Sequence, residues 1–528
     1  MEENMKMSKS IPDWVFKLKD KAKEKRKVNL VESYLENSTL HGVKYIVLRQ
    51  AKWYQKTFWI VMLCLSTAAC SQQMYRIWKK WEESPIILSF GNNMKSLSEI
   101  PFPAVTICID SGLNKAIVDV SKNMTSLERV KLQHLAQLTC GTSDKKSNSP
   151  DTFNVSQVVD FLKLVSAPLD MSVSDCKYRT VSENCRKLFS PVLIDRGLCY
   201  TFNGLANDEI FREGVRTIKW WEDKNETFLN KWSLENGYEL PEDDIHVLES
   251  LYPFVALDVG ADFGLNIKTT STLLHIVNNC PKVANGFKII LHNPVEFPHA
   301  RRISYRSNVN ADVSIFVRPE YITTPDEPVL YIEPTRRKCY FSDERQLKYF
   351  RYYTQDNCAV ECLTNVTLQQ CQCVAFYMPT TTPVPICSAT NQCFRNVTKL
   401  MVKNQIEKTV CSCLPACTEL SYTVENSHTY SSETTAKSSI SNNTGSVNVV
   451  FTEAYFITKE RKELYGKTEF LSNCGGTLGL FLGFSVLSLV EVIYYISLYF
   501  SNKRRILLSQ APSMASLDIT QIKRRQTL

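Results

Sequence analysis

The sequence predicts a membrane protein in which two transmembrane helices flank a large, disulfide-rich α+β extracellular domain. Three observations predict this fold class. Two long uncharged runs lie near the ends of the 528-residue chain, the excess of basic residues is confined to those ends, and 16 of the 19 cysteines lie between the runs. With 44% hydrophobic and 22% charged residues, the chain is neither disordered nor fibrous.

The first uncharged run covers residues 57–75, between Lys56 and Arg76. As a helix it would be about 28 Å long, close to the hydrocarbon thickness of a bilayer. A signal peptide or a buried core helix is the alternative, but a signal peptide does not begin after so long a lysine-rich lead. We therefore expect a transmembrane helix at 57–75, preceded by a cytoplasmic region at 1–56.

The second run covers residues 470–502 and contains one charge, Glu491, before the basic triplet Lys503-Arg504-Arg505. A removable lipid-anchor tail would end the chain, whereas this chain continues to Leu528. The run is too long for a helix perpendicular to the membrane, so a tilt or a break is expected. We expect a transmembrane helix at 474–500 and a cytoplasmic tail at 501–528.

The net charge of +8 belongs to the two ends of the chain. Residues 1–56 carry 13 Lys/Arg against 7 Asp/Glu, and residues 501–528 carry 6 against 1, which leaves the remainder at −3. This distribution gives no reason to expect a nucleic-acid partner. Lys and Arg close to the two runs are too evenly placed to decide the orientation in the membrane.

The cysteines decide the orientation. Cys64 and Cys70 lie in the first run, Cys474 opens the second, and the other 16 lie between Cys108 and Cys417. An even set of that size implies an oxidising compartment, so residues 76–473 are expected to be extracellular and both termini cytoplasmic. Asn37 would then be cytoplasmic and unglycosylated. Six N-x-S/T glycosylation motifs agree with this topology: Asn123, Asn154, Asn225, Asn365, Asn396 and Asn442.

Segments of the predicted extracellular domain differ in their local patterns. Runs rich in β-branched and aromatic residues predict strands, whereas apolar residues at helical spacing predict helices. A stretch full of Ser, Thr and Asn predicts an exposed loop. The predicted strands are Ala104–Ile109, 286–291 and 447–456, the predicted helices are 127–138 and 345–353, and the predicted loop is 426–446.

The most specific local pattern is the cysteine spacing Cys358-x3-Cys362, Cys371-x-Cys373 and Cys411-x-Cys413-x3-Cys417. Zinc binding is the rival interpretation, but no C-x2-C pair occurs and histidines are scarce nearby. We therefore expect a disulfide ladder that stiffens this segment into a rod, and we expect no metal site and no cofactor.

Glycines in the second run allow two interpretations. Gly475, Gly479 and Gly483 recur every four residues, which is typical of a stripe along which helices pack closely. Alternatively, Gly483-Phe484-Ser485 interrupts the helix within the membrane, where freed carbonyls beside a water-filled cavity replace part of a cation's hydration shell. Glu491 favours the second interpretation, because several subunits would form a ring of carboxylates, although it could instead extend to the cytoplasmic surface.

Several motifs, in the same order, resemble the degenerin/epithelial sodium channel family from about Leu35 to Phe500, and most closely its insect pickpocket branch. They are His41-Gly42, Phe102-Pro103-Ala104-Val105-Thr106-Ile107-Cys108, Gly197-Leu198-Cys199-Tyr200-Thr201-Phe202-Asn203, His292-Asn293-Pro294 through Phe297-Pro298, the cysteine ladder and Gly483-Phe484-Ser485. Members of that family are trimers of two-span subunits with large disulfide-rich extracellular domains.

The resemblance implies roles for individual residues. His41-Gly42 would act in gating, Gly483-Phe484-Ser485 would form the selectivity filter, and Gly479 and Glu491 would belong to the pore. Ser472 matches the position outside the gate where bulky side chains hold such channels open. The implied disulfides are Cys108–Cys199, Cys176–Cys185, Cys339–Cys417, Cys358–Cys413, Cys362–Cys411, Cys371–Cys393 and Cys373–Cys387, and the remaining Cys140 and Cys280 are predicted to pair.

The expected function is that of a plasma-membrane cation channel subunit. It would be trimeric, sodium-permeable, amiloride-sensitive and gated through its extracellular domain. Its partners would be sodium and other monovalent cations, membrane lipid, and identical or related subunits in a homotrimer or heterotrimer. Phe484 is bulkier than the residue many family members carry, which weakens the expectation of strong sodium selectivity.

Three other classes are less well supported by the residues. A non-conducting receptor or accessory subunit would not need the glycines or Glu491. ATP-gated receptors share the two-span architecture, but their glycine and lysine motifs are not evident. An enzyme is least expected, because the sequence has no H-E-x-x-H, G-x-S-x-G or P-loop motif.

Overall fold

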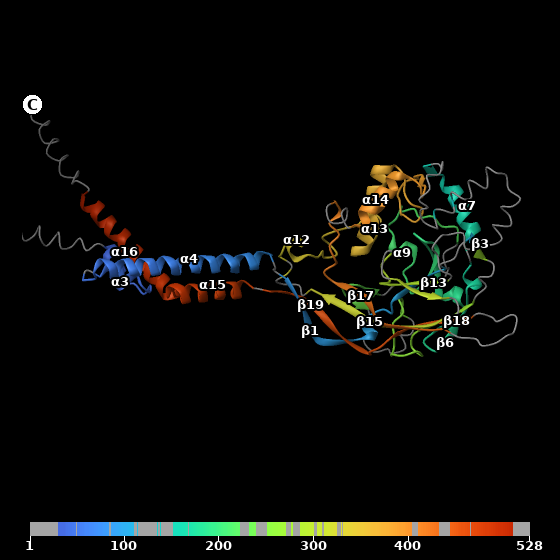
Figure 1. Cartoon of the computed structure of the whole chain (residues 1–528), viewed down its shortest axis with the longest axis horizontal. Helices are drawn as coiled ribbons and strands as arrows, with labels where there is room; N and C mark the ends of the chain where they lie inside the picture. The colour runs from blue at the N-terminus through green and yellow to red at the C-terminus, as the bar shows by residue number, and fades with distance from the viewer. Residues whose placement is uncertain are drawn as a thin grey trace, which may run out of the picture. The chain divides into compact units, whose positions relative to one another are not determined.

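In the computed structural model the chain forms two compact units, which are described separately (Figure 1). One unit combines Met1–Ile86 with Glu463–Leu528, and the other is Ile87–Lys462. The residues that the structure describes are 30–48, 50–83, 86–109, 113–114, 135, 138, 151–166, 168–221, 232–238, 251–270, 276–277, 286–299, 304–308, 311–324, 329, 331–403, 410–431, 444–464 and 466–510.

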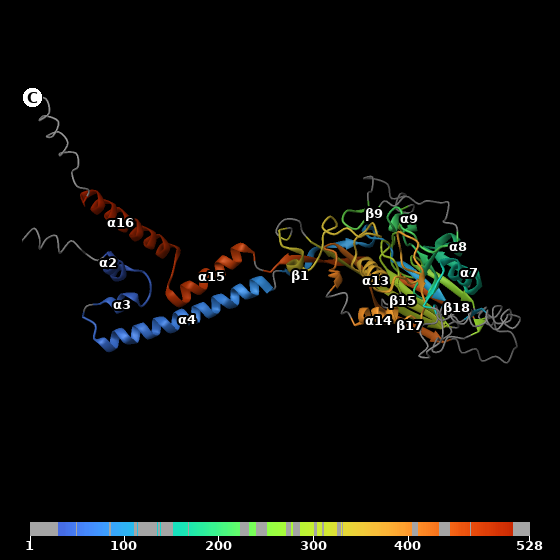
Figure 2. The same cartoon turned by 90° about the horizontal axis from the view of Figure 1, so that it is seen from above.

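The first unit is helical. Figures 1 and 2 show α15 running alongside α4, and the two helices pack through residues such as Cys474, which is 7% exposed. The rings of Trp81 and Phe470, 5.1 Å apart, close one end of this pair. Among the described residues, the helices of the unit are α2 (Leu30–Asn37), α3 (Val43–Val47), α4 (Trp53–Glu83), α15 (Lys467–Leu482) and α16 (Val486–Gln510).

Helix α4 contains the predicted first span, 57–75, and extends beyond it at both ends. Taken alone, none of the helices among the described residues combines the length and apolarity needed to cross a membrane. By length and composition, α15 and the 486–501 part of α16 would suffice together, with a bend of 76° between them. Of the tilt or break that the length of the second run predicts, the structure shows a break.

The second unit is built on an eight-stranded mixed sheet with the order β1-β19-β15-β18-β11-β5-β6, and β17 also pairs with β15. Most pairings are antiparallel, whereas β15 runs parallel to β18 and β19. The strands are β1 (Ile86–Ser96), β5 (Val173–Tyr178), β6 (Val181–Glu183), β11 (Leu265–Thr270), β15 (Ala311–Thr323), β17 (Glu419–Ser431), β18 (Thr444–Phe451) and β19 (Tyr455–Glu463).

A five-stranded antiparallel sheet, ordered β14-β13-β2-β8-β7, forms the second β layer. Its central strands are buried on both faces, which explains why β2 and β13 are mainly apolar without regular alternation, and Lys288 and His292 of β13 are buried as well. The strands are β2 (Ala104–Ile109), β7 (Phe189–Ile194), β8 (Gly197–Phe202), β13 (Gly286–His292) and β14 (Ser304–Asn308).

Short strands and helices complete the second unit. The strand pairs are β3 (Leu113–Asn114) with β12 (Ile276–Val277), β4 (Thr152–Phe153) with β16 (Ile386–Cys387), and β9 (Trp232–Ser233) with β10 (Gly237–Tyr238). The helices are α7 (Val155–Val165), α8 (Cys185–Leu188), α9 (Asn207–Ile210), α12 (Pro334–Arg337), α13 (Gln355–Cys371) and α14 (Gln392–Val402), with 3-10 turns at Leu97–Glu99 and Leu169–Met171.

Disulfides brace α13 and α14 and tie the sheets. The structure contains the seven pairs that the family resemblance implies, whereas Cys140 and Cys280 lie outside the described residues. Cys64, Cys70 and Cys474 are free thiols. The seven bonds are Cys108–Cys199, Cys176–Cys185, Cys339–Cys417, Cys358–Cys413, Cys362–Cys411, Cys371–Cys393 and Cys373–Cys387.

Three secondary-structure predictions need correction. Residues 345–353 do not form a helix, because their backbone bonds laterally to 210–212, with Arg212 N donating to Tyr349 O at 2.9 Å. The predicted strand 447–456 is divided between β18 and β19. The predicted loop 426–446 contributes its described ends to β17 and β18. Of the predicted helix 127–138, only Leu135 and Leu138 lie within the described residues, and both are helical.

Candidate functional site

The interruption between α15 and α16 is capped on both sides by its own sequence. Gly483 has φ of +64°, a left-handed conformation that glycine adopts without the strain of a β-carbon. Its amide donates to Gly479 O at 3.0 Å. On the other side, the Ser488 hydroxyl accepts from Ser485 N at 3.1 Å and the Ser485 hydroxyl accepts from Ser488 N at 3.3 Å. The triplet Gly483-Phe484-Ser485 therefore ends one helix and begins the next.

The break frees backbone carbonyls. Phe481 O accepts from the Ser66 hydroxyl of α4 at 2.5 Å, and Leu482 O accepts from His41 N at 3.2 Å. Within the part of the chain that the structure describes, no donor reaches the carbonyl oxygens of Gly483 and Phe484. Unpaired carbonyl dipoles of this kind are the ligands that coordinate partly dehydrated cations in channels.

The His41-Gly42 pair lies against this break. Gly42 turns the chain with φ of +89° into α3, where the Tyr45 ring stacks on Trp59 of α4 at 4.6 Å. The His41 ring is so close to Gly483 that a β-carbon added to that glycine would lie 1.6 Å from His41 Nδ1. Two motifs from opposite ends of the sequence are thus brought together.

Glu491 also contacts the N-terminal segment. Its Oε2 accepts from the Thr39 hydroxyl at 2.9 Å and from Thr39 N at 3.3 Å. The same hydroxyl lies 2.8 Å from Ser488 Oγ, and Ser488 is only 1% exposed. A carboxylate held in this way fixes residues 38–42 to α16 through charge-assisted hydrogen bonds.

The other predicted site residues on α15 are separate from this contact. Ser472 is exposed, and so is Gly479, which joins the break only through its carbonyl. No atom lies within 4 Å of a β-carbon added at Gly475 or Gly476, because α15 packs on α4 through a different face. The glycine stripe is therefore not a packing surface against α4 of the same chain.

Sequence reasoning missed three hydroxyl residues that hold the site together: Thr39, Ser66 and Ser488. Ser66 and Ser488 lie in long apolar segments, where a hydroxyl must find a partner. The spacing Ser485-x-x-Ser488 resembles a helix-capping pattern and could have indicated the start of α16. Nothing in the sequence indicated that Thr39 pairs with Glu491, because the two residues are distant in the chain.

Three of the six predicted glycosylation sites lie within the described residues. Asn154, Asn365 and Asn396 have exposed side chains, whereas Asn123, Asn225 and Asn442 lie outside the described residues. Among the residues with described positions, no group of three or more His, Cys, Asp or Glu side chains could hold a metal ion.

The chain combines a disulfide-braced, β-rich domain with apolar helices. A break between two of these helices frees backbone carbonyls, and this combination is typical of ion-channel subunits. A family model described as amiloride-sensitive sodium channel matches residues 34–495. The chain belongs to this degenerin/epithelial sodium channel family and is a cation channel subunit.

Individual relatives agree with the family assignment. Pickpocket protein 28 of Drosophila melanogaster is 29% identical over 88% of this chain and 77% of its own length. Pickpocket protein 11 of the same species is 23% identical over 89% of this chain and 76% of its own. Acid-sensing ion channel 2 of Mus musculus is 23% identical over 92% of this chain and 90% of its own. The family consists of plasma-membrane channels, not enzymes, that conduct sodium and assemble as trimers.

Proposed function

We propose that this chain is one of three subunits of a sodium-permeable, amiloride-sensitive cation channel that is gated through its extracellular domain. The observation that carries the proposal is the helix break at 483–485, with the carbonyl oxygens of Gly483 and Phe484 left without donors among the described residues. Three copies would provide a ring of such carbonyls, which one chain with two spans cannot form alone.

The proposed topology has two spans. Residues 57–75 of α4 form the first, and residues 474–500, from α15 into α16, form the second. Residues 76–473 are extracellular, and residues 1–56 and 501–528 are cytoplasmic. The seven disulfides of the second unit support this assignment, because such bonds persist in an oxidising compartment.

In this channel, Gly483, Phe484 and Ser485 form the selectivity filter, and His41 and Gly42 act in gating. The amide of His41 bonds to Leu482 O and its ring lies against Gly483, so a shift of residues 38–42 would be transmitted to the filter without an intermediate. Glu491 stabilises the same segment through Thr39 and adds negative charge to the cytoplasmic half of the pore. Ser472, a small residue outside the gate, permits closure.

The decisive experiment is expression of Ser472→Phe in oocytes under voltage clamp, with wild type as the control. We expect a larger inward sodium current in the variant, blocked by amiloride, because the bulky side chain opposes closure. Surface biotinylation measures the protein that reaches the membrane. Absence of an amiloride-sensitive current despite surface protein, alone and with a related subunit, would contradict the channel and favour a non-conducting receptor or accessory subunit.

The filter assignment has its own test. In Gly483→Arg the new side chain must occupy the space of the His41 ring and carries a positive charge into the break. We expect the cation current to be lost while the surface protein is retained. Unchanged current would show that residues 483–485 are not the filter.

A further inference from the structure

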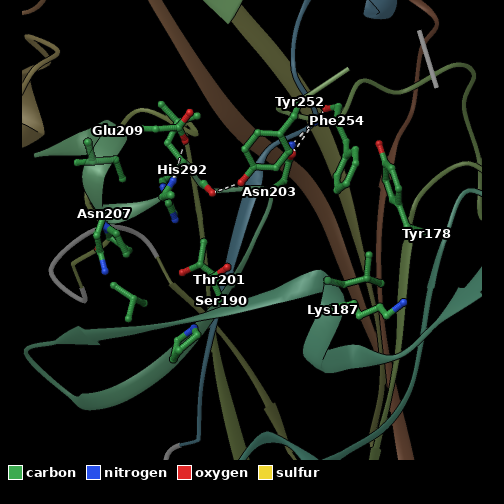
Figure 3. A pocket seen from close by; sticks show the side chains of 18 of the residues that line it. Tyr178, Lys187, Ser190, Thr201, Asn203, Asn207, Glu209, Tyr252, Phe254 and His292 are labelled. Carbon is green, nitrogen blue, oxygen red and sulfur yellow. Dashed lines mark hydrogen bonds between the residues drawn. The ribbon is translucent and has the colours of Figure 1, made fainter. Parts of the chain in front are cut away.

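Two cavities of the second unit adjoin helix α9, whose Asn207 and Asp208 line both. The larger has a volume of about 1030 Å³, and Figure 3 shows Asn207 and Glu209 on one side of it and Lys187 on the opposite side. Glu209 and Lys187 already interact with other residues of the protein, so they do not indicate a ligand of either charge. The smaller cavity, of about 670 Å³, differs in its charged residues, and its size suits a small organic molecule.

The charged residues that line the smaller cavity are mostly basic. Three of them are arginines, and among the residues that the structure describes no carboxylate forms an ion pair with any of the three. The positive charge of these guanidinium groups is therefore not neutralised by a direct partner within the described chain. The basic residues are Arg212, Arg216, Lys219 and Arg351, and the acidic residues of the lining are Asp208 and Glu213.

Two of the arginines are held in place by a bridge between distant segments of the chain. Arg212 N donates to Tyr349 O at 2.9 Å, and Arg212 Nε donates to Phe350 O at 3.0 Å. From the other segment, Arg351 Nε donates to Phe211 O at 2.9 Å. Each guanidinium is thus anchored through its Nε to the opposite segment. Its two terminal nitrogens donate to no residue that the structure describes, and these nitrogens can bind a carboxylate end-on.

The third arginine is placed by a second bridge. Arg216 N donates to Thr380 O at 2.6 Å, and Thr380 N donates to Arg216 O at 3.0 Å. The Arg216 side chain is exposed and forms no hydrogen bond or ion pair with the described part of the chain. Three guanidinium groups therefore line one cavity, where like charges repel one another and a bound anion would lower their energy.

The floor of the smaller cavity is apolar and buried. The Cys373–Cys387 disulfide braces it, because each of these cysteines is adjacent in sequence to a residue of the floor. Apolar side chains offer an inorganic ion no hydrogen bonds, so this floor favours a ligand with an apolar body. The floor residues, each 5% exposed or less, are Phe211, Val374, Phe376, Met378 and Ile386.

We propose that the smaller cavity binds an organic carboxylate with an apolar body, of the arylalkanoate class. The carboxylate would accept hydrogen bonds from the guanidinium groups of Arg212, Arg216 and Arg351, which supply donors and positive charge together. The aromatic body would lie on the rings of Phe211 and Phe376. Binding here goes beyond the proposed channel function and does not depend on conduction.

The first test compares ligands on the purified full-length chain in detergent micelles, with binding measured by calorimetry. The probes are 3-phenylpropionate, the uncharged 3-phenylpropan-1-ol, the cationic 3-phenylpropylamine, and acetate, which lacks the apolar body. We expect 3-phenylpropionate to bind about tenfold or more tightly than the alcohol and than acetate, because each lacks one half of the recognised structure. No binding is expected for the amine.

Three results of this comparison would overturn the proposal. They are absence of 3-phenylpropionate binding at millimolar concentration, binding of the amine as tight as that of the carboxylate, and equal affinity for acetate. The last result would describe a site for small anions and not for an arylalkanoate.

Variants locate the binding. Arg216→Gln should weaken 3-phenylpropionate binding about two- to fivefold, which is the worth of an exposed ion pair, and should leave alcohol binding unchanged. Glu213→Gln removes an exposed negative charge from the lining and should tighten carboxylate binding about twofold. Arg196→Gln changes an exposed arginine that does not line the cavity and is the matched control.

Equal affinities of Arg216→Gln and Arg196→Gln would contradict the site, and so would weaker carboxylate binding by Glu213→Gln. All three variants should fold, because the replaced side chains form no hydrogen bond or ion pair with the residues that the structure describes. Because no current is measured, failure of the channel proposal would leave this result intact. The reverse also holds, since loss of carboxylate binding says nothing against conduction.

Discussion

At the scale of single residues, Gly483 is the position where the backbone and a neighbour both require glycine. Its φ is +64°, which costs other L-residues about 1 kcal/mol or more, and an added β-carbon would overlap the His41 ring. Gly476, on the same helix, has open space around the same added atom. Comparing the same substitution at Gly483 and at Gly476 therefore separates the steric effect of the added β-carbon from the general effect of removing a glycine.

We predict that Gly483→Ala reduces the surface-normalised cation current several-fold, whereas Gly476→Ala leaves it within about twofold, since alanine favours a helix interior. The first variant must displace residues 38–42 or unwind the cap of α15, and the second does neither. Voltage clamp combined with surface biotinylation measures both. Equal currents for the two alanine variants would mean that the contact of His41 with Gly483 has no part in the open channel.

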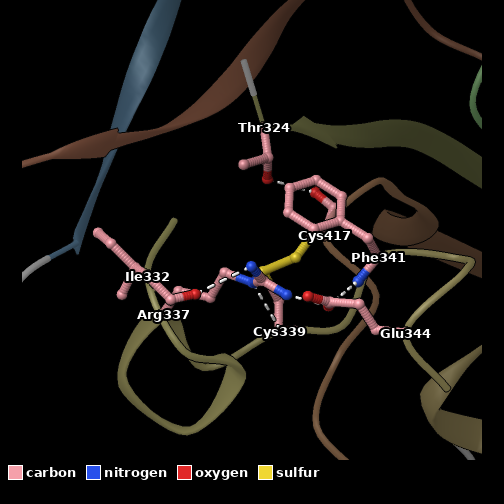
Figure 4. Close-up of polar contacts among 7 residues, drawn as sticks. All are labelled: Thr324, Ile332, Arg337, Cys339, Phe341, Glu344 and Cys417. Carbon is pink, nitrogen blue, oxygen red and sulfur yellow. Dashed lines mark hydrogen bonds and ion pairs between the residues drawn. A yellow bond between two sulfur atoms is a disulfide. The ribbon is translucent and has the colours of Figure 1, made fainter. Parts of the chain in front are cut away.

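Arg337 is a second residue whose surroundings fix its identity. Figure 4 shows its guanidinium between Glu344 and the carbonyl groups of Ile332 and Cys339, beside the Cys339–Cys417 bond. The side chain is 1% exposed, and its Nε donates to Cys339 O at 3.1 Å. Burial lowers the pKa of Arg337, but a guanidinium starts so high that it remains charged at neutral pH.

We predict that Arg337→Met lowers the free energy of unfolding by about 2–4 kcal/mol, because Glu344 and two buried carbonyls lose their donor together. Lys338→Met, at the exposed neighbouring position, should change it by less than about 0.5 kcal/mol. Denaturant unfolding of the purified chain with its disulfides intact measures both. A loss below about 1 kcal/mol for Arg337→Met would show that water replaces the guanidinium.

At the scale of elements, two neighbouring disulfides of the cysteine ladder join α13 to residues 411–413. Cys358 and Cys362 are four residues apart on α13, which is about 6 Å along a helix. Their partners Cys413 and Cys411 are two residues apart, on either side of Ser412, whose φ of +46° turns the chain. The C-x3-C and C-x-C motifs therefore form adjacent rungs between α13 and residues 411–413.

We predict that removing the inner rung with Cys362→Ser and Cys411→Ser together costs about 2–3 kcal/mol. This is less than a loop of 49 residues suggests, because Cys358–Cys413 already closes most of that loop. Removing both rungs should cost more than the sum of the two single-rung losses. Chemical denaturation of the three variants measures the difference, and simple additivity would contradict the ladder as a unit.

Elements also show how far the sequence could predict the structure. Ala104–Ile109 is a strand with the predicted bounds, because an apolar β-branched run buried on both faces needs no other information. For the second run, length predicted a tilt or a break, and the glycines allowed either a packing stripe or a break at 483–485. Residues 345–353 were mistaken for a helix because the partners of their backbone, Ile210 and Arg212, are distant in sequence. The same reason hid the bond between Thr39 and Glu491.

At the scale of the whole molecule, the division into two units lies close to the predicted membrane boundaries at 76 and 473, with breaks after Ile86 and after Lys462. The predicted topology places all the disulfides of the second unit outside the cell. It also assigns opposite sides of the membrane to asparagines that otherwise look alike. Asn37, Asn154, Asn365 and Asn396 are all exposed and all lie in N-x-S/T motifs.

We predict that Asn154, Asn365 and Asn396 carry glycans and that Asn37 does not, because only the lumenal side of the secretory pathway contains the transferase. Each Asn→Gln change at the first three positions should increase the electrophoretic mobility of the chain expressed in animal cells by one step, and glycosidase treatment should abolish the differences. Asn37→Gln should migrate with wild type, and Asn37 is a matched control because its motif is equally exposed. A glycan at Asn37, or none at the other three, would reverse or refute the proposed orientation while leaving the fold of both units unchanged.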